Sequence, residues 1–320
     1  MLAQAVTSGS GVDPFAFQAH PDVWLLVAAL TGAYVYMVKA VGPHAVIAGQ
    51  PVVTRRNVVA FGAAMAMLWV ASDWPIHDLG EGYLYSVHMF QHMMLTFFLP
   101  PLALLATPEW LLRALIGKDR LYGVLRWLCK PVVAGLLFNL AIVITHIPGV
   151  VNASVTSDSA ALHYGLHLMA VSASLLMWMP VCGPFRELQM GTGGKMIYLF
   201  LQSVLPTIPA GWLTFAEGSV YDAYDGPTRV WNLSVTDDQQ LAGAVMKLGG
   251  SMFLWTIIVV LWFKRFASSY QDEHQYRRGR LMPTAEIVGH DEDPLTYDDV
   301  EREFARVPAT TEPDRAQPDR

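Results

Sequence analysis

The chain has 320 residues, of which 53% are hydrophobic, and its mean hydropathy of +0.34 is too high for an ordinary soluble domain of this size. Of its 48 Asp, Glu, Lys and Arg side chains, 22 lie in residues 264–320, which leaves the preceding 263 residues poor in charge. This profile is typical of a polytopic membrane protein with a polar tail, and the formal net charge of −6 argues against a nucleic-acid partner.

Seven apolar segments approach the roughly 20 residues that a helix needs to cross a bilayer, so we predict an all-α bundle of seven transmembrane helices. In chain order they are Val23–Val41, Asn57–Ser72, Tyr83–Thr107, Val132–Ile147, Ala161–Cys182, Met196–Ala216 and Gln239–Phe263. Residues 1–22 contain no Lys or Arg and therefore lack the basic start of a cleavable signal. We expect the first apolar segment to be retained as a helix.

The charges of the loops predict the orientation of the bundle. Three loops and the tail carry most of the cations, whereas the opposite loops are acidic; the cationic loop residues are Arg55, Arg56, Arg113, Lys118, Arg120, Arg126, Lys130, Arg186 and Lys195. By the positive-inside rule the N-terminus lies outside and the C-terminus in the cytoplasm. We therefore expect a multi-pass protein of the inner (plasma) membrane.

This topology divides the chain into three parts. Residues 1–22 form an extracytoplasmic segment, residues 23–265 a seven-helix membrane domain, and residues 266–320 a cytoplasmic tail. Within the domain, residues 108–130 alternate leucines with basic residues, which is typical of an amphipathic connector at the membrane surface. Residues 271–320 lack apolar periodicity, so we expect them to be largely disordered, with a short helix over Leu295–Phe304.

Histidines within the predicted helices all lie toward the extracytoplasmic side. Two pairs have the i, i+4 spacing that places both rings on one helix face. With a rise of 1.5 Å per residue, the five rings fall within a slab of roughly 10 Å; they belong to His88, His92, His146, His163 and His167. His77, in an outer loop, is a further candidate.

Ionisable residues inside a membrane are costly and usually functional, although a lone histidine is more often a hydrogen-bonded packing residue. Two such pairs at one depth favour a metal or cofactor site, and imidazole suits zinc, copper, iron and nickel. Met89 and Met93 lie beside the first pair, and thioethers favour Cu(I). The two cysteines, Cys129 and Cys182, are too far apart in the sequence to suggest a thiolate site.

Other residues at this depth are predicted to support the site. Asp73, Asp238 and Gln239 are candidates for hydrogen bonds to the ligand imidazoles. Prolines and glycines interrupt three of the helices, and irregular backbone at membrane depth is tolerated where it lines a cavity or is buried in protein. Lys247 lies about 12 Å into the outer leaflet, so it must snorkel, pair with an acid or face a wet cavity.

Several stretches between about residues 20 and 265 resemble, in order, the CtaG family of membrane-embedded cytochrome c oxidase assembly factors. They are residues 88–92 with Pro100-Pro101-Leu102, Thr145-His146-Ile147-Pro148-Gly149, Leu162-His163 with His167, residues 178–183, residues 213–216 and residues 238–243. The resemblance implies about seven helices, a role in maturing haem-copper oxidases through copper, and the same five histidines as the family's histidine positions. Lys247 departs from the apolar residue expected there.

We therefore hypothesise an assembly factor that binds copper, as Cu(I), through outer-leaflet histidines and supports metal insertion into a haem-copper oxidase subunit of the respiratory chain. A periplasmic copper donor would be a second partner. The sequence contains no arrangement typical of a nucleophilic or paired-carboxylate enzyme. Alternatives are a copper permease, a haem-binding redox protein with axial histidines, and a purely structural oxidase partner.

Overall fold

The computed structural model describes residues 13–117, 120–156, 160–226 and 228–281, together with residues 301, 302 and 305, and all the regular structure in these residues is helical. The chain separates into two units, Met1–Arg265 and Phe266–Arg320. The α-helices are α1 (Pro21–Tyr36), α2 (Gly42–Ala45), α3 (Arg55–Ser72), α4 (Ile76–Gly82), α5 (Tyr85–Met93), α6 (Leu99–Ala106), α7 (Glu109–Ile116), α8 (Arg120–Leu128), α9 (Pro131–Thr145), α10 (Pro148–Thr156), α11 (Ala160–Cys182), α12 (Thr192–Val204), α13 (Thr207–Thr214), α14 (Val235–Ala244) and α15 (Gly250–Leu281).

The predicted all-helical membrane architecture is confirmed in outline. Six helical runs in the described residues are long and apolar enough to cross a membrane: Pro21–Ala45, Arg55–Gly82, Tyr85–Ala106, Ala161–Cys182, Thr192–Thr214 and Val235–Tyr270. A seventh requires α8 and α9 to be counted together, although they meet at a 73° bend. Alone, the 15 residues of α9 reach only about 22 Å, which is short of a hydrocarbon core of roughly 30 Å.

Short helical turns connect or extend the long helices. Those with π geometry are η1 (Met37–Val41), η2 (Met94–Phe98) and η6 (Val245–Gly249), and the 3-10 turns are η3 (Arg186–Leu188), η4 (Asp222–Tyr224) and η5 (Val230–Asn232). Turns η2 and η6 lie within the runs α5–α6 and α14–α15, so each of these spans changes its winding midway. Single π turns of this kind occur frequently at functional sites.

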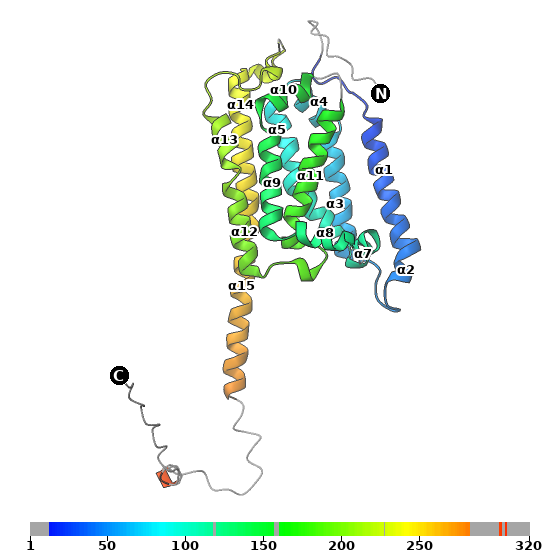
Figure 1. Ribbon diagram of the computed structural model, residues 1–320, viewed down its shortest axis with the longest axis vertical. Helices are drawn as coiled ribbons and strands as arrows, with labels where there is room; N and C mark the ends of the chain where they lie inside the picture. The colour runs from blue at the N-terminus through cyan, green and yellow to red at the C-terminus, as the bar shows by residue number, and fades with distance from the viewer. Residues whose placement is uncertain are drawn as a thin grey trace, which may run out of the picture. The chain divides into compact units, whose positions relative to one another are not determined.

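Within the first unit, the run α5–α6 is the most buried of the six candidate spans. In Figure 1, α5 lies among α3, α9 and α11, whereas α1 stands at one edge of the bundle. Helices α4 and α10 lie at one end of the bundle, and the amphipathic helices α7 and α8 lie at the other. These two short helices occupy the predicted connector of residues 108–130.

A side chain from a distant part of the sequence caps the start of α5. The N-cap residue, Leu84, has no side-chain oxygen to accept a hydrogen bond from the first turn. Asp238 of α14 accepts hydrogen bonds there from the backbone N–H groups of Tyr85 (2.7 Å) and Ser86 (3.1 Å) and from the Ser86 hydroxyl (2.5 Å). Its negative charge also interacts favourably with the partial positive charge at the N-terminus of α5. The contact ties α14 to α5.

A second polar contact ties α5 and α6 to α11. Pro100 has no N–H to donate to the carbonyl of Thr96 four residues earlier. The hydroxyl of Ser174 on α11 donates to that carbonyl instead. The proline therefore leaves no unpaired carbonyl in the buried core, and the two helices that carry the histidine pairs are joined directly.

Helix α15 continues to Leu281, past residue 265, where the sequence predicts the membrane domain to end. It therefore extends eleven residues into the segment that was expected to be disordered from residue 271. The residues there include Gln, Glu and Arg, which are good helix formers, so an apolar periodicity is not needed to continue a helix that has already started. Most of the predicted helix Leu295–Phe304 lies outside the described residues.

Replacing Asp238 with Asn should destabilise the bundle, because the amide retains only one oxygen for three donors and loses the charge. Hydrogen bonds to a charged group are worth about 1.5–3 kcal/mol, so we expect the free energy of unfolding to fall by that order. The thermal midpoint of the detergent-solubilised protein would fall accordingly. Asp222→Asn, at an exposed position of η4, is the control; equal midpoints for the two variants would show that the cap does not stabilise the fold.

Candidate metal centre

The two predicted histidine pairs face one another across the interface of α5 and α11. The ring centroids are 4.6 Å apart for His88 and His92 and 4.5 Å apart for His163 and His167. Between the helices, His92 and His167 are separated by 4.7 Å and His88 and His167 by 5.8 Å. His88, His92 and His163 are buried and His167 is half-buried. The four imidazoles thus form one cluster.

Potential ligand atoms in this cluster form two overlapping groups. The first comprises ring nitrogens of His88, His92 and His167, and the second comprises Glu81, His163 and His167. Within each group the ligand atoms lie within 4.8 Å of one another. Because His167 belongs to both, we describe all five residues as the outer centre. Its donors are imidazoles and one carboxylate, a set that suits zinc or copper.

Glu81 was not among the predicted site residues. It lies on α4, a seven-residue helix that the sequence analysis treated as an acidic loop. Its Oε1 atom is 3.0 Å from Nε2 of His163, 3.3 Å from Nδ1 of His88 and 4.0 Å from Nε2 of His167. The acid therefore lies at the junction of both helices. A carboxylate eleven residues before His92 has no recognisable ligand spacing, so no sequence pattern indicates this role.

Gly80 allows α4 to approach α5 this closely. A Cβ atom at residue 80 would lie 3.1 Å from both the backbone nitrogen and Cα of His88, which is tighter than ordinary contacts. The hydroxyl of Tyr224 also donates a hydrogen bond to the Gly80 carbonyl at 3.1 Å. Burial raises the pKa of Tyr224 well above its ordinary value, so this phenol remains a donor at neutral pH.

The polar atoms at the centre of the cluster fit a bound cation. Oε1 of Glu81, Nδ1 of His88 and Nε2 of His163 are buried and make no aligned hydrogen bond, although Oε1 lies 3.3 Å from Nδ1 of His88 and 3.0 Å from Nε2 of His163. Buried polar atoms without partners are rare and cost about 1–3 kcal/mol each. A proton shared between carboxylate and imidazole would offset part of this cost. A metal ion would satisfy all three atoms and displace that proton.

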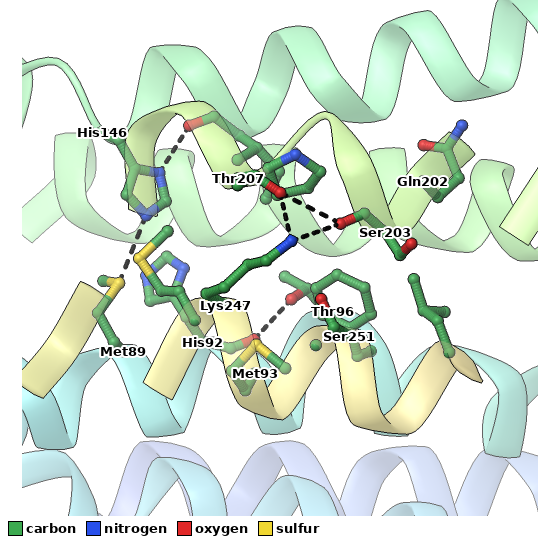
Figure 2. A pocket seen from close by; sticks show the side chains of 16 residues that line it. Met89, His92, Met93, Thr96, His146, Gln202, Ser203, Thr207, Lys247 and Ser251 are labelled. Carbon is green, nitrogen blue, oxygen red and sulfur yellow. Dashed lines mark hydrogen bonds between the residues drawn. The ribbon is translucent and has the colours of Figure 1, made fainter. Parts of the chain in front are cut away.

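His146 and Met89, also predicted as ligands, lie beside the outer centre and outside both of its groups. The ring of His146 is 6.4 Å from that of His92, and its Nε2 atom is 3.4 Å from Sδ of Met89. Both residues, with His92 and Met93, line an internal cavity of about 30 Å³ (Figure 2). The predicted single cluster is therefore divided into two neighbouring groups of donors.

His77 lies at the rim of the cluster. Its Nδ1 atom is 3.2 Å from Nε2 of Gln91, and its ring is 6.5 Å from that of His163 and 5.0 Å from that of His20. His20, to which the sequence assigned no role, pairs with Asp78 at 3.0 Å. His77 is thus outside both groups of ligand atoms, and a line of imidazoles extends from the outer centre to the loop before α1.

The three residues predicted to orient the imidazoles form hydrogen bonds with other groups. Asp238 caps α5, and Gln239 accepts hydrogen bonds from the N–H groups of Val220 and Tyr221. The carboxylate of Asp73 accepts from the indoles of Trp24 and Trp69. These polar groups instead satisfy backbone donors and indole N–H groups near the site, because such donors have no water to bind in a membrane bundle.

Aromatic residues that the sequence analysis did not single out cover the outer centre. The ring of Tyr85 stacks on that of His88, with centroids 5.7 Å apart, and Tyr221 and Tyr224 pack against Tyr85. The hydroxyl of Tyr221 donates to the His146 carbonyl at 3.0 Å. The loop before α14 thus covers the outer centre and the neighbouring pair of His146 and Met89.

The chain matches the model of a known protein family. The family model described as the cytochrome c oxidase caa3 assembly factor (Caa3_CtaG) matches residues 32–268, which include every residue of the outer centre. No curated protein and no solved structure matches the chain.

Replacing Glu81 with Gln should weaken metal binding about 10- to 100-fold, because the amide removes the one negative charge among the donors while keeping its shape. Zn²⁺ affinity of the purified protein, measured by competition with a coloured chelator, tests this. Glu217→Gln, an exposed glutamate in a loop, is the matched control. If both variants bind Zn²⁺ as tightly as the wild type, Glu81 serves only to pair with the imidazoles.

Proposed function

The chain belongs to the cytochrome c oxidase caa3 assembly factor family, and from this premise we propose that it holds copper at the outer centre and passes it to a subunit of a haem-copper oxidase. The observation that carries the proposal is the convergence of Glu81, His88 and His163, whose buried ligand atoms face one another without hydrogen-bond partners. In this proposal the protein is a metal-handling factor and catalyses no reaction of its own.

The donor set supports copper as the ion. Imidazole is a good ligand for copper, and two or three imidazoles at one point leave a coordination position open for exchange with an acceptor. Haem-copper oxidases require copper, so an assembly factor for them has a use for such a site. The ion is cargo in this scheme, and the outer centre holds it only until a recipient competes for it.

We further propose that the outer centre faces the extracytoplasmic side of the inner membrane. Helices α7 and α8, with their exposed cations Arg120 and Arg126, lie at the end of the bundle opposite to α4 and α10 (Figure 1). The positive-inside rule places the end with α7 and α8 in the cytoplasm. Copper would then arrive from a periplasmic donor and leave toward the oxidase on the same side.

The cavity beneath the centre favours an assembly factor over a permease. Lys247 of η6 lines this cavity together with His92, and its ammonium donates hydrogen bonds to the Thr207 hydroxyl (2.5 Å) and the Ser203 carbonyl (3.5 Å). A positive charge within a low-dielectric bundle repels a second cation more strongly than it would in water. A copper ion that moved from the centre toward the cytoplasm would have to pass it.

The dimensions of the site disfavour haem. The cavity beside the imidazoles has a volume of about 30 Å³, whereas cofactor pockets occupy roughly 300–1,000 Å³. Each imidazole ring of the outer centre has its nearest neighbouring imidazole 4.5 or 4.6 Å away, measured between ring centroids. This packing leaves space for an ion and excludes a porphyrin ring unless the helices separate.

Replacing His88 and His167 together with Ala should abolish copper binding at the outer centre of the purified protein, because both groups of ligand atoms lose a member. Membranes from cells carrying this variant should then contain an oxidase with less copper and lower activity. Metal analysis and oxygen consumption are the measurements, and His44→Ala, at an exposed position of α2, is the control. Full oxidase activity with the double variant would remove copper delivery as the function.

Vesicles that contain the wild-type protein should bind copper without accumulating it. Uptake of radioactive copper should saturate at the protein's own binding capacity, and that capacity should be lower in the His92→Ala, His167→Ala variant. Copper that accumulates in the lumen beyond that capacity, and is released by detergent, would favour the permease instead.

A further inference from the structure

His146 and Met89 form a second pair of metal-ligating atoms that the outer centre does not use. Nε2 of His146 lies 3.4 Å from Sδ of Met89, and both side chains are buried. The pair lines the internal cavity together with His92 and Met93 (Figure 2). His92 is thus adjacent to both sites.

The hydrogen bonds of His146 determine which of its nitrogens is free. Nδ1 lies 2.6 Å from the carbonyl oxygen of Ile142, which can only accept. The single proton of the neutral ring is therefore assigned to Nδ1, and Nε2 keeps its lone pair. The thioether sulfur of Met89 also has no proton. Two acceptors thus face each other at contact distance with no hydrogen between them.

The spacing of these two acceptors suits a shared ion. With metal–nitrogen and metal–sulfur bonds of about 2.0 and 2.3 Å, an ion bound to both atoms would make an angle of about 100° between them, close to tetrahedral. The second ring nitrogen is already held by a carbonyl, as it is in most metal-binding histidines.

The charges around the cavity favour a monovalent cation over a divalent one. Imidazole and thioether are neutral, so they offset none of the charge of a cation, and the ammonium of Lys247 lines the same cavity. The repulsion on a divalent cation is twice that on a monovalent one. Thioether sulfur also favours soft ions. The outer centre differs, because Glu81 supplies a negative charge there.

We propose that His146 and Met89 form an inner site that binds a soft monovalent cation, Cu(I). His92 and Met93 line the same cavity. This inner site is distinct from the outer centre. The inner site rests on the proposed function only in that the outer centre is taken as the source of the ion. Since His92 borders both sites, it provides the route between them.

Ag(I), a redox-stable stand-in for Cu(I), and Zn(II) distinguish the two sites in the purified full-length protein. The wild type should bind one more equivalent of Ag(I) than of Zn(II). Met89→Leu should remove one equivalent of Ag(I) and the sulfur ligand from the X-ray absorption spectrum, and should leave Zn(II) binding unchanged. Met177→Leu, fully buried in the core away from the cavity, is the matched control and should bind as the wild type does.

Two further variants complete the test. His146→Gln should lose the same equivalent of Ag(I), which provides an independent measurement if Met89→Leu fails to fold. Lys247→Met should admit Zn(II) to the inner site and raise its stoichiometry by one. Unchanged Ag(I) binding and no sulfur ligand in any variant would overturn the inner site. Loss of Zn(II) binding in His88→Ala, His167→Ala is a separate result that concerns the outer centre alone.

Discussion

The structure depends on burying one carboxylate and four imidazoles at one depth in an apolar bundle. Outside water, such groups must find partners, and the partners available are one another, a proton or a metal ion. Several features of the fold hold them in contact. Gly80 lets α4 approach α5, Asp238 caps the start of α5, and Ser174 joins the middle of α5–α6 to α11. These three features position the helices without using the ligand atoms of the outer centre.

Opposite charges lie on the two sides of His92 in this arrangement. Glu81 supplies a negative charge to the outer centre, and Lys247 supplies a positive charge to the cavity beyond it. A cation is therefore attracted to the outer centre and repelled from the far end of the cavity. This asymmetry suits a protein that receives and returns an ion on one side of the membrane. Lys247, an unexpected residue at membrane depth, donates hydrogen bonds to a hydroxyl and a carbonyl, and these neutral partners leave its positive charge in place.

The sequence predicted those features that depend on local pattern. Apolar length located the spans, and the i, i+4 spacing placed His88 with His92 and His163 with His167. Local sequence pattern could not locate Glu81. The position of this residue depends on how closely the seven-residue helix α4 packs against α5, which is a tertiary contact. For the same reason, the sequence does not reveal that Asp238 caps α5: an acid at the start of a helix can cap its own helix, bind a ligand or cap a neighbour. The division between the outer centre and His146 likewise follows from packing, since all five histidines lie at similar depth.

The most direct test of a metal centre here is to locate the ion. Crystals of the copper-loaded protein, measured at the copper absorption edge, give an anomalous signal that depends on no assumption about function. The account predicts a peak surrounded by Glu81 and the imidazoles of α5 and α11. A copper-saturated protein with no peak there, or with copper only on surface residues, would contradict it.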